Sequence, residues 1–260
     1  MTDVSIAQID PQHATPTGGA TIVAIETPTL GDRSYLVHDG RVAFVIDPQR
    51  DIDRVLQLAD AADVRITHIF ETHIHNDYVT GGLALARETG AAYHVNAADP
   101  VAYERTGVRD GDVIDVTPVL RVRVLATPGH TYTHLSYVLE ERGAQTAVFS
   151  GGSLLFGSTG RPDLLGSAHT HDLVHHQYAS AHRLAAELPD QTRVMPTHGF
   201  GSFCSATQSE ASASTIGMEK ISNPVLGQSA SVTRMPIGRW SEKPSGSTGS
   251  PIPPFGRSLG

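Results

Sequence analysis

The stretch 71-ETHIHNDYVTGG-82 places three possible metal-binding side chains at alternate positions: His73, His75 and Asp77. It follows an apolar run that is typical of a β-strand, and alternate side chains of an extended chain point the same way. Imidazole is the commonest metal ligand near neutral pH. The three side chains could therefore converge on one ion at the end of the strand. Two histidines at this spacing also occur by chance on a surface, so this stretch alone leaves both interpretations open.

Two further histidines stand where a predicted strand gives way to a loop. His130 follows Pro128-Gly129, a pair that forces a sharp turn and lets the backbone approach closely. His198 follows another strand, within 196-PTHGFG-201. One histidine at a strand end is best explained as structural. Four of them at three separate junctions predict a shared site.

The order of these motifs resembles the metallo-β-lactamase superfamily, over residues from about 20 to 205. The stretch 148-VFSGGSLLFGSTGRPDL-164 is similar to the persulfide dioxygenase and glyoxalase II branch, and more to the persulfide dioxygenases, in which Gly-Arg-x-Asp follows the same junction. The ending THGFGSFCSA is similar to bacterial members that are joined to rhodanese-like domains. The polar segment after Ser222 is too short to be such a domain. The resemblance implies an α/β fold, a single metallo-β-lactamase-like αββα sandwich.

The resemblance also implies roles for individual residues. The first metal position corresponds to His73, His75 and His130, and the second includes Asp77 and His198. The family has a histidine where this chain has Tyr78 and an aspartate where it has Gly152. A phenol with a pKa of about 10 is a poor ligand at neutral pH, and glycine has no side-chain donor. We therefore expect one bound ion, with Asp77 either a ligand or a partner that orients a histidine.

The resemblance implies Fe(II) held by two histidines and a carboxylate, with positions open for O2 and substrate. Three imidazoles can hold Fe(II) as well, or zinc with a bound water of pKa about 7. The favoured interpretation is a mononuclear iron enzyme that oxidises low-molecular-weight persulfides, such as glutathione persulfide, to sulfite. In it, Asp77 and Tyr78 are the catalytic residues, and Tyr78 hydrogen-bonds substrate or oxygen. A zinc-dependent thioester hydrolase of the glyoxalase II kind and a non-catalytic scaffold remain as alternatives.

Other side chains have two interpretations each. Arg161 could bind a substrate carboxylate, such as that of glutathione, or form an ion pair with Asp163. Tyr132 could line the substrate cleft or pack within the fold. Cys204 could lie near the site, although a buried and unreactive cysteine is the simpler interpretation. The histidines of 169–176 fit the solvated face of a helix.

Strands and helices alternate irregularly along one domain, as in a layered α/β fold. Apolar spacing predicts helices at 51–63, with Asp51 as N-cap, and at 79–90, 171–190 and 206–221. The first 19 residues have the composition of a flexible arm, and 20–221 have that of the metallo-β-lactamase-like domain. Residues 222–260 are rich in Ser, Gly and Pro and are predicted to be disordered or loosely docked.

Composition limits the partners. The formal net charge of the 260 residues is −8, and no basic run is present, so we expect no nucleic acid partner. No apolar stretch approaches the roughly 18 residues of a membrane span, and the N-terminus does not resemble a secretory signal. A single cysteine fits a reducing cytoplasm. The expected ligand is a small thiol, persulfide or thioester, and a homodimer is an open possibility.

Overall fold

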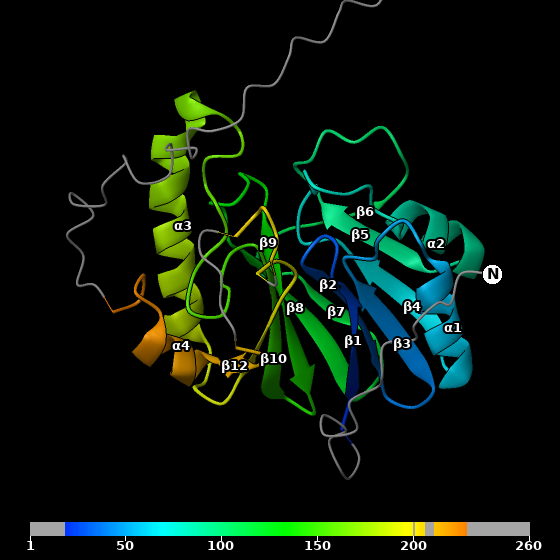
Figure 1. Ribbon diagram of the computed structural model, residues 1–260. Coiled ribbons are helices and arrows are strands. Elements are labelled where there is room, and N and C mark those ends of the chain that lie inside the picture. The colour runs from blue at the N-terminus through cyan, green and yellow to red at the C-terminus, as the bar shows by residue number, and fades with distance from the viewer. Residues whose placement is uncertain (1–18, 200, 206–210, 228–260) are drawn as a thin grey trace, which may run out of the picture. The chain divides into compact units, whose positions relative to one another are not determined.

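The computed structural model describes residues 19–199, 201–205 and 211–227. They form two six-stranded sheets, each with helices on its outer face (Figure 1). This arrangement confirms the predicted αββα sandwich. The predicted N-terminal arm lies outside the described residues except for Gly19, as does the predicted tail beyond Gly227.

The first sheet has the order β1-β2-β3-β4-β5-β6. Its strands are β1 (Thr21–Thr27), β2 (Asp32–His38), β3 (Val42–Ile46), β4 (Arg65–Phe70), β5 (Ala92–Asn96) and β6 (Thr106–Val108). The first three are antiparallel, with Gly40 in a left-handed conformation at the β2–β3 turn, whereas β3 to β6 run parallel. Helices α1 (Asp53–Ala61) and α2 (Gly82–Thr89) make the β3–β4 and β4–β5 crossovers. Parallel strands need such crossovers, which explains why helical spacing appears at these places in the sequence.

The second sheet has the order β12-β11-β10-β9-β8-β7. Its strands are β7 (Val113–Asp115), β8 (Leu120–Ala126), β9 (Leu135–Glu141), β10 (Ala144–Gly151), β11 (Arg193–Pro196) and β12 (Ser214–Thr215). Helices α3 (Ser167–Glu187) and α4 (Ile216–Ser222) belong to this half (Figure 1). Among the described residues, no helix combines the length and the apolar character needed to cross a membrane.

Three apolar cores hold these layers together. The central core lies between the sheets, where the ring of Phe149 packs against Tyr35 at 5.3 Å and against Phe44 at 6.1 Å. A second core joins the first sheet to α1 and α2, and a third joins the second sheet to α3 and α4. Each sheet is therefore buried on both faces, and polar side chains gather at the strand ends.

Local polar contacts shift two predicted helix starts. Helix α1 begins at Asp53 after Ile52, and the predicted N-cap Asp51 makes no cap hydrogen bond; its carboxylate pairs with Arg54 at 2.6 Å instead. Helix α3 begins at Ser167, before the predicted residue 171, directly after Gly166 with its positive φ of 99°. The prediction of α2 is confirmed, and Gly90 ends this helix in a left-handed conformation.

The C-terminal segment also differs from the sequence-based boundaries. The predicted helix at 206–221 is the short strand β12 followed by α4, with 206–210 outside the described residues. The folded part continues beyond the expected boundary at 221. Asn223 is buried and donates to the Ser158 carbonyl at 2.9 Å, and Val225 packs against the third core.

A buried histidine outside the site makes stability depend on pH. His94 is 4% exposed, and its ring stacks on Phe70 at 4.5 Å. Burial lowers its pKa from about 6.5 to about 4. Between these values the unfolded chain binds a proton that the folded chain excludes, so stability is lost as pH falls from 6.5 to 4.

We expect this histidine to contribute up to about 3 kcal/mol to the loss of unfolding free energy across that window. Urea unfolding of the wild type and of His94→Gln at several pH values measures it, with the exposed His171→Gln as control. Equal pH slopes for wild type and His94→Gln would contradict the assignment.

Candidate metal centre

The structure brings the four predicted metal-binding histidines together. His73 and His75 follow β4, His130 follows β8 and His198 follows β11. The ring of His73 lies 4.1 Å from that of His75, 4.8 Å from His130 and 5.2 Å from His198, measured between centroids. The rings of His130 and His198 are also 5.2 Å apart. Residues that are far apart in the sequence thus form one cluster at the strand ends.

This cluster is buried, and two of its imidazoles, those of His73 and His130, are in the neutral form that can donate a lone pair. His73, His130 and His198 are at most 2% exposed. Burial and the neighbouring imidazoles lower the pKa of His73 and of His130 well below the ordinary range. Both rings are therefore neutral at neutral pH, which is the form that binds metal ions.

The pattern of hydrogen bonds leaves nitrogen atoms available for a cation. His130 donates from Nδ1 to the Arg161 carbonyl at 2.9 Å, and its Nε2 has no partner among the described residues. Nδ1 of His75 also has no hydrogen-bond partner among the described residues. The Nε2 atoms of His73 and His198 face each other at 3.2 Å. Ligand atoms of His73, His75 and His198 all lie within 4.8 Å of one another. Buried, unpartnered nitrogen atoms at this spacing fit a metal ion.

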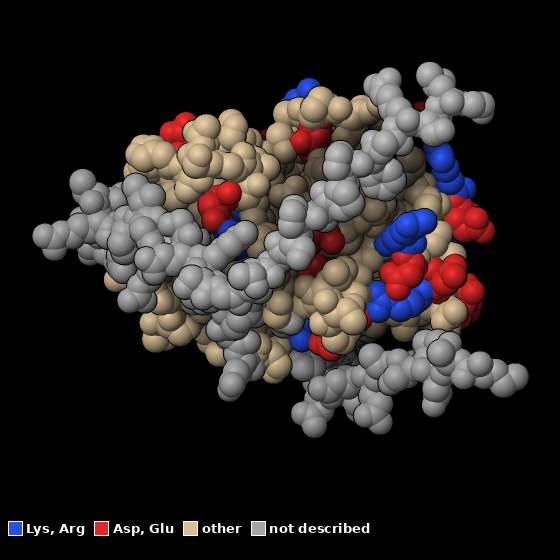
Figure 2. All heavy atoms as spheres, turned by 45° about the horizontal axis from the view of Figure 1, so that its top comes forward, with Lys and Arg blue, Asp and Glu red and all other residues tan. Residues whose placement is uncertain are grey.

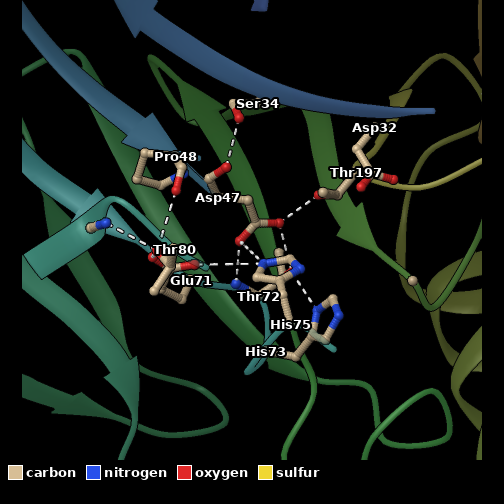
Figure 3. Close-up of polar contacts among 12 residues, drawn as sticks. Asp32, Ser34, Asp47, Pro48, Glu71, Thr72, His73, His75, Thr80 and Thr197 are labelled. Carbon is tan, nitrogen blue, oxygen red and sulfur yellow. Dashed lines mark hydrogen bonds and ion pairs between the residues drawn. The ribbon is translucent and has the colours of Figure 1, made fainter. Parts of the chain in front are cut away.

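A buried carboxylate anchors the loop that carries His73 and His75. Asp47 follows β3 and is 0% exposed. Its Oδ1 accepts from the Thr72 amide and its Oδ2 from the Thr72 hydroxyl, both at 2.7 Å, and Oδ2 also accepts from the Thr197 hydroxyl. Figure 3 shows these contacts converging on the carboxylate. Asp47 thereby links the loops after β3, β4 and β11.

The carboxylate of Asp47 also affects the protonation of His75. Nε2 of His75 lies 3.4 Å from Asp47 Oδ1 and 3.5 Å from Glu71 Oε2. Burial alone would lower the pKa of His75, but the two carboxylates raise it to about 10. Burial likewise would raise the pKa of Asp47, and His75 holds it below the usual value. Without a bound ion the ring is therefore protonated at neutral pH. The carboxylates hold the proton on Nε2, so Nδ1 is the nitrogen that would give up its proton and bind a cation.

The sequence reasoning missed both carboxylates. Asp47 closes the apolar run VAFVID, and Glu71 closes ITHIFE. A carboxylate at the C-terminal end of each of two buried parallel strands was the available signal, because such ends meet at one edge of a sheet.

Tyr78 contacts a candidate ligand rather than the space among the histidines. Its ring stacks on that of His75 at 4.2 Å, and its hydroxyl lies 2.9 Å from His75 Nε2. The hydroxyl also donates to the Asp47 carbonyl at 3.4 Å. This placement favours a positioning role for Tyr78 over the contact with substrate that the sequence suggested.

Asp77 lies beside His198, on another side of the cluster. His198 donates from Nδ1 to Asp32 Oδ1 at 2.9 Å, and the same nitrogen is 3.5 Å from Asp77 Oδ2. Asp77 Oδ2 also accepts from the Cys204 thiol at 3.3 Å, whereas its Oδ1 has no partner among the described residues. Burial and Asp77 raise the pKa of this thiol above its usual range. Asp32, which the sequence reasoning missed, fixes the orientation of His198.

Gly152 lies directly beneath the ring of His130. A Cβ atom at position 152 would lie 2.4 Å from His130 Cδ2, which is far inside van der Waals contact. The amide of Gly152 donates to Nε2 of His134 at 3.0 Å, and Nδ1 of His134 lies 2.9 Å from the Thr127 hydroxyl. His134 is thus satisfied on both nitrogens and supports the cluster structurally. A side chain at position 152 and the present position of His130 exclude each other.

We therefore expect Gly152→Ala to displace His130, with a cost of about 1–3 kcal/mol in unfolding free energy and a marked loss of metal affinity. Chemical unfolding and metal titration measure the two effects. Gly227→Ala is the control, since its new Cβ would meet nothing closer than 3.8 Å. Unchanged metal affinity in Gly152→Ala would show that His130 is not a ligand.

The two predicted substrate-binding side chains are differently placed. The guanidinium of Arg161 forms two hydrogen bonds to Asp163, at 2.9 and 2.7 Å, and stacks over Phe203. This is the ion pair that the sequence left as the alternative; only the main chain of Arg161 touches the cluster. Tyr132 is 43% exposed, and its hydroxyl lies 3.1 Å from His169 Nδ1 at the start of α3.

Charged side chains of both signs are present on the surface of the molecule. On the face shown in Figure 2, Lys and Arg side chains lie next to Asp and Glu side chains and form no continuous basic area. Elsewhere in the described structure such side chains form ion pairs, as Arg183 does with Asp110 at 2.8 Å.

Comparisons with known proteins agree with this geometry. Residues 30–198 match the family model described as the metallo-beta-lactamase superfamily. A hydroxyacylglutathione hydrolase of Polaromonas sp. (strain JS666 / ATCC BAA-500) is 34% identical over 61% of this chain. The chain spans only 57% of the length of that relative.

Two solved structures are similar. A metallo-beta-lactamase from Staphylococcus aureus subsp. aureus COL superposes with a TM-score of 0.74 at 30% identity, over 80% of this chain and 65% of the other. ETHE1 from Myxococcus xanthus gives a TM-score of 0.67 at 33% identity, over 80% of this chain and 85% of the other. The chain therefore belongs to the metallo-beta-lactamase superfamily and, by the names of its relatives, to the branch that contains the hydroxyacylglutathione hydrolases and ETHE1.

Proposed function

We propose that the chain is a metal-dependent hydrolase of glutathione thioesters. The observation that carries this proposal is the set of buried imidazoles around His73, in which His130 lies where the first side-chain atom of any residue larger than glycine at position 152 would need to be. Three imidazoles with an open position are a known donor set for catalytic zinc. The curated relative that hydrolyses hydroxyacylglutathione supports the same substrate class.

The protein side chains have separate tasks in this reaction. A zinc ion bound by the histidines would lower the pKa of a water molecule to about 7 and polarise the thioester carbonyl. Asp47 holds the loop of His73 and His75, and Asp32 fixes the ring of His198. Asp77 keeps one carboxylate oxygen, Oδ1, without a partner among the described residues, which supports a role for it as the acceptor of a proton from the attacking water.

Persulfide oxidation, which the sequence favoured, is the second candidate. Two features support it: the Gly-Arg-Pro-Asp stretch at 160–163, and the similarity to ETHE1 over 85% of that chain. Gly152 removes the carboxylate donor of the Fe(II) set, but three imidazoles can hold Fe(II) as well as zinc, so this position does not decide between the candidates. The similarity to a hydroxyacylglutathione hydrolase favours the thioester. The order of the two functions is therefore reversed relative to the sequence-based preference.

One pair of assays separates the candidates. The protein is loaded with zinc or, without oxygen, with Fe(II), and each form is given a lactoylglutathione thioester and glutathione persulfide. The proposal expects loss of thioester absorbance with the zinc form and no O2 uptake above that of His130→Ala. Rapid O2 uptake with the iron form, together with no thioester cleavage, would establish the second candidate instead.

A further inference from the structure

Cys204 lies within reach of the histidine cluster. It is 1% exposed, and its Sγ lies within 4.8 Å of ligand nitrogens of His130 and His198, which are within the same distance of each other. The sequence left two interpretations open, a thiol near the site and, as the simpler one, a buried and unreactive cysteine. The structure places its sulfur among the imidazoles.

The backbone fixes this sulfur and His130 together. The Arg161 amide donates to the Cys204 carbonyl at 2.8 Å, and the Arg161 carbonyl accepts from His130 Nδ1 at 2.9 Å. The Cys204 amide in turn donates to the Ser202 hydroxyl at 3.2 Å, and Gly160 forms an isolated bridge with Ser205. One short segment therefore sets the positions of both the thiol and the imidazole.

An unpartnered nitrogen on one of the two imidazoles grouped with the thiol points to a ligand. Nε2 of His130 is buried and has no hydrogen-bond partner among the described residues. Asp32 occupies Nδ1 of His198, so Nε2 is the nitrogen that this ring directs into the cluster. Two imidazole nitrogens and a sulfur atom, all buried and mutually close, form a chemically coherent donor set.

We propose that Cys204 is a metal ligand and that its thiolate, with His130 and His198, replaces the donors absent at Tyr78 and Gly152. This inference rests on the proposed metal-dependent function. On binding an ion, the thiol would give up its proton, so that a metal–sulfur bond would replace the S–H bond. Asp77 Oδ2, which already accepts a hydrogen bond from that thiol, takes the proton and passes it to solvent. A thiolate is a soft donor, so the site would select zinc or iron over magnesium or manganese.

Cobalt(II) is the probe, because a cobalt–thiolate bond produces a charge-transfer absorption in the near ultraviolet. Cys204 is the single cysteine of the chain, so this absorption has one possible protein source. We expect the band in the full-length wild type at one cobalt per chain. Cys204→Ala and Cys204→Ser should lose the band and bind cobalt at least about tenfold more weakly. Circular dichroism and thermal unfolding check that both variants fold.

The outcomes are distinguishable. Visible cobalt absorption without the charge-transfer band, with equal affinity in wild type and Cys204→Ala, overturns the role of Cys204 and leaves the metal site standing. Absence of saturable cobalt binding by the wild type overturns this inference and the proposed function together. Because the band is measured on the wild type, the test holds even if a variant fails to fold.

Discussion

Replacement of His130 by alanine is expected to lower thioester hydrolysis by the zinc-loaded protein by more than about 100-fold. Removing a residue that only orients a metal ligand lowers metal affinity or activity about 10–100-fold. His130 is positioned to bind the metal directly, so its removal should have a larger effect. Its Nε2 is buried and unpartnered, and its Nδ1 is fixed on the Arg161 carbonyl. Kinetic constants and bound zinc, measured on the same preparation, show the effect.

The matched control for His130→Ala is His171→Ala. His171 lies on α3 with 70% of its side chain exposed, so its removal should change neither zinc content nor turnover. An equal loss of bound zinc and turnover in both variants would mean that the number of histidines, rather than the cluster, determines metal binding. Full activity and full zinc content in His130→Ala would show that the remaining histidines form the site without it.

Replacement of Asp47 by asparagine should weaken both metal binding and folding. Asp47 adopts a left-handed conformation, with φ of 48°, which asparagine tolerates, so the substitution mainly removes charge. Without that charge the pKa of His75 falls and the ring loses the acceptor that keeps its proton on Nε2. We expect metal affinity to drop about 10–100-fold. Breaking a buried ion pair should also lower the unfolding free energy by about 3–5 kcal/mol.

Zinc titration and urea unfolding measure the two effects of Asp47→Asn. Asp115→Asn is the control because Asp115 pairs with Arg121 on the surface, with 68% of its side chain exposed. Exposed pairs contribute about 0–1 kcal/mol, so this variant should resemble the wild type. If Asp47→Asn destabilises the fold while zinc affinity stays unchanged, Asp47 is structural and does not orient a metal ligand.

The four histidines were predictable because each carries a local signal. His73 and His75 follow an apolar strand, and His130 and His198 stand beside glycine at strand-to-loop junctions. Their convergence requires in addition that the two sheets pack together, because β4 belongs to the first sheet and β8 and β11 belong to the second. The layered fold was predictable for a similar reason, since strand and helix periods appear in short stretches of sequence.

The orienting partners were not predictable from spacing. Asp32 and His198 are 166 residues apart in the sequence, and Tyr78 meets the Asp47 carbonyl across 31 residues. The first pair forms only after the two sheets have packed together, and the second only after β3 and β4 have paired within the first sheet. The short strands β6 and β7 were missed because they are largely exposed and carry little apolar pattern. In contrast, the Arg161–Asp163 pair spans two positions and could be weighed from sequence.

Zinc titration of the chelator-treated wild type, followed directly by the thioester assay, tests the central claim most directly. The structure predicts saturable binding of zinc with one equivalent per chain, and hydrolysis of a lactoylglutathione thioester that rises in proportion to occupancy. His130→Ala should show neither. Saturation with zinc without any thioester cleavage would contradict the proposed hydrolase, and absence of saturable binding would contradict the metal centre itself.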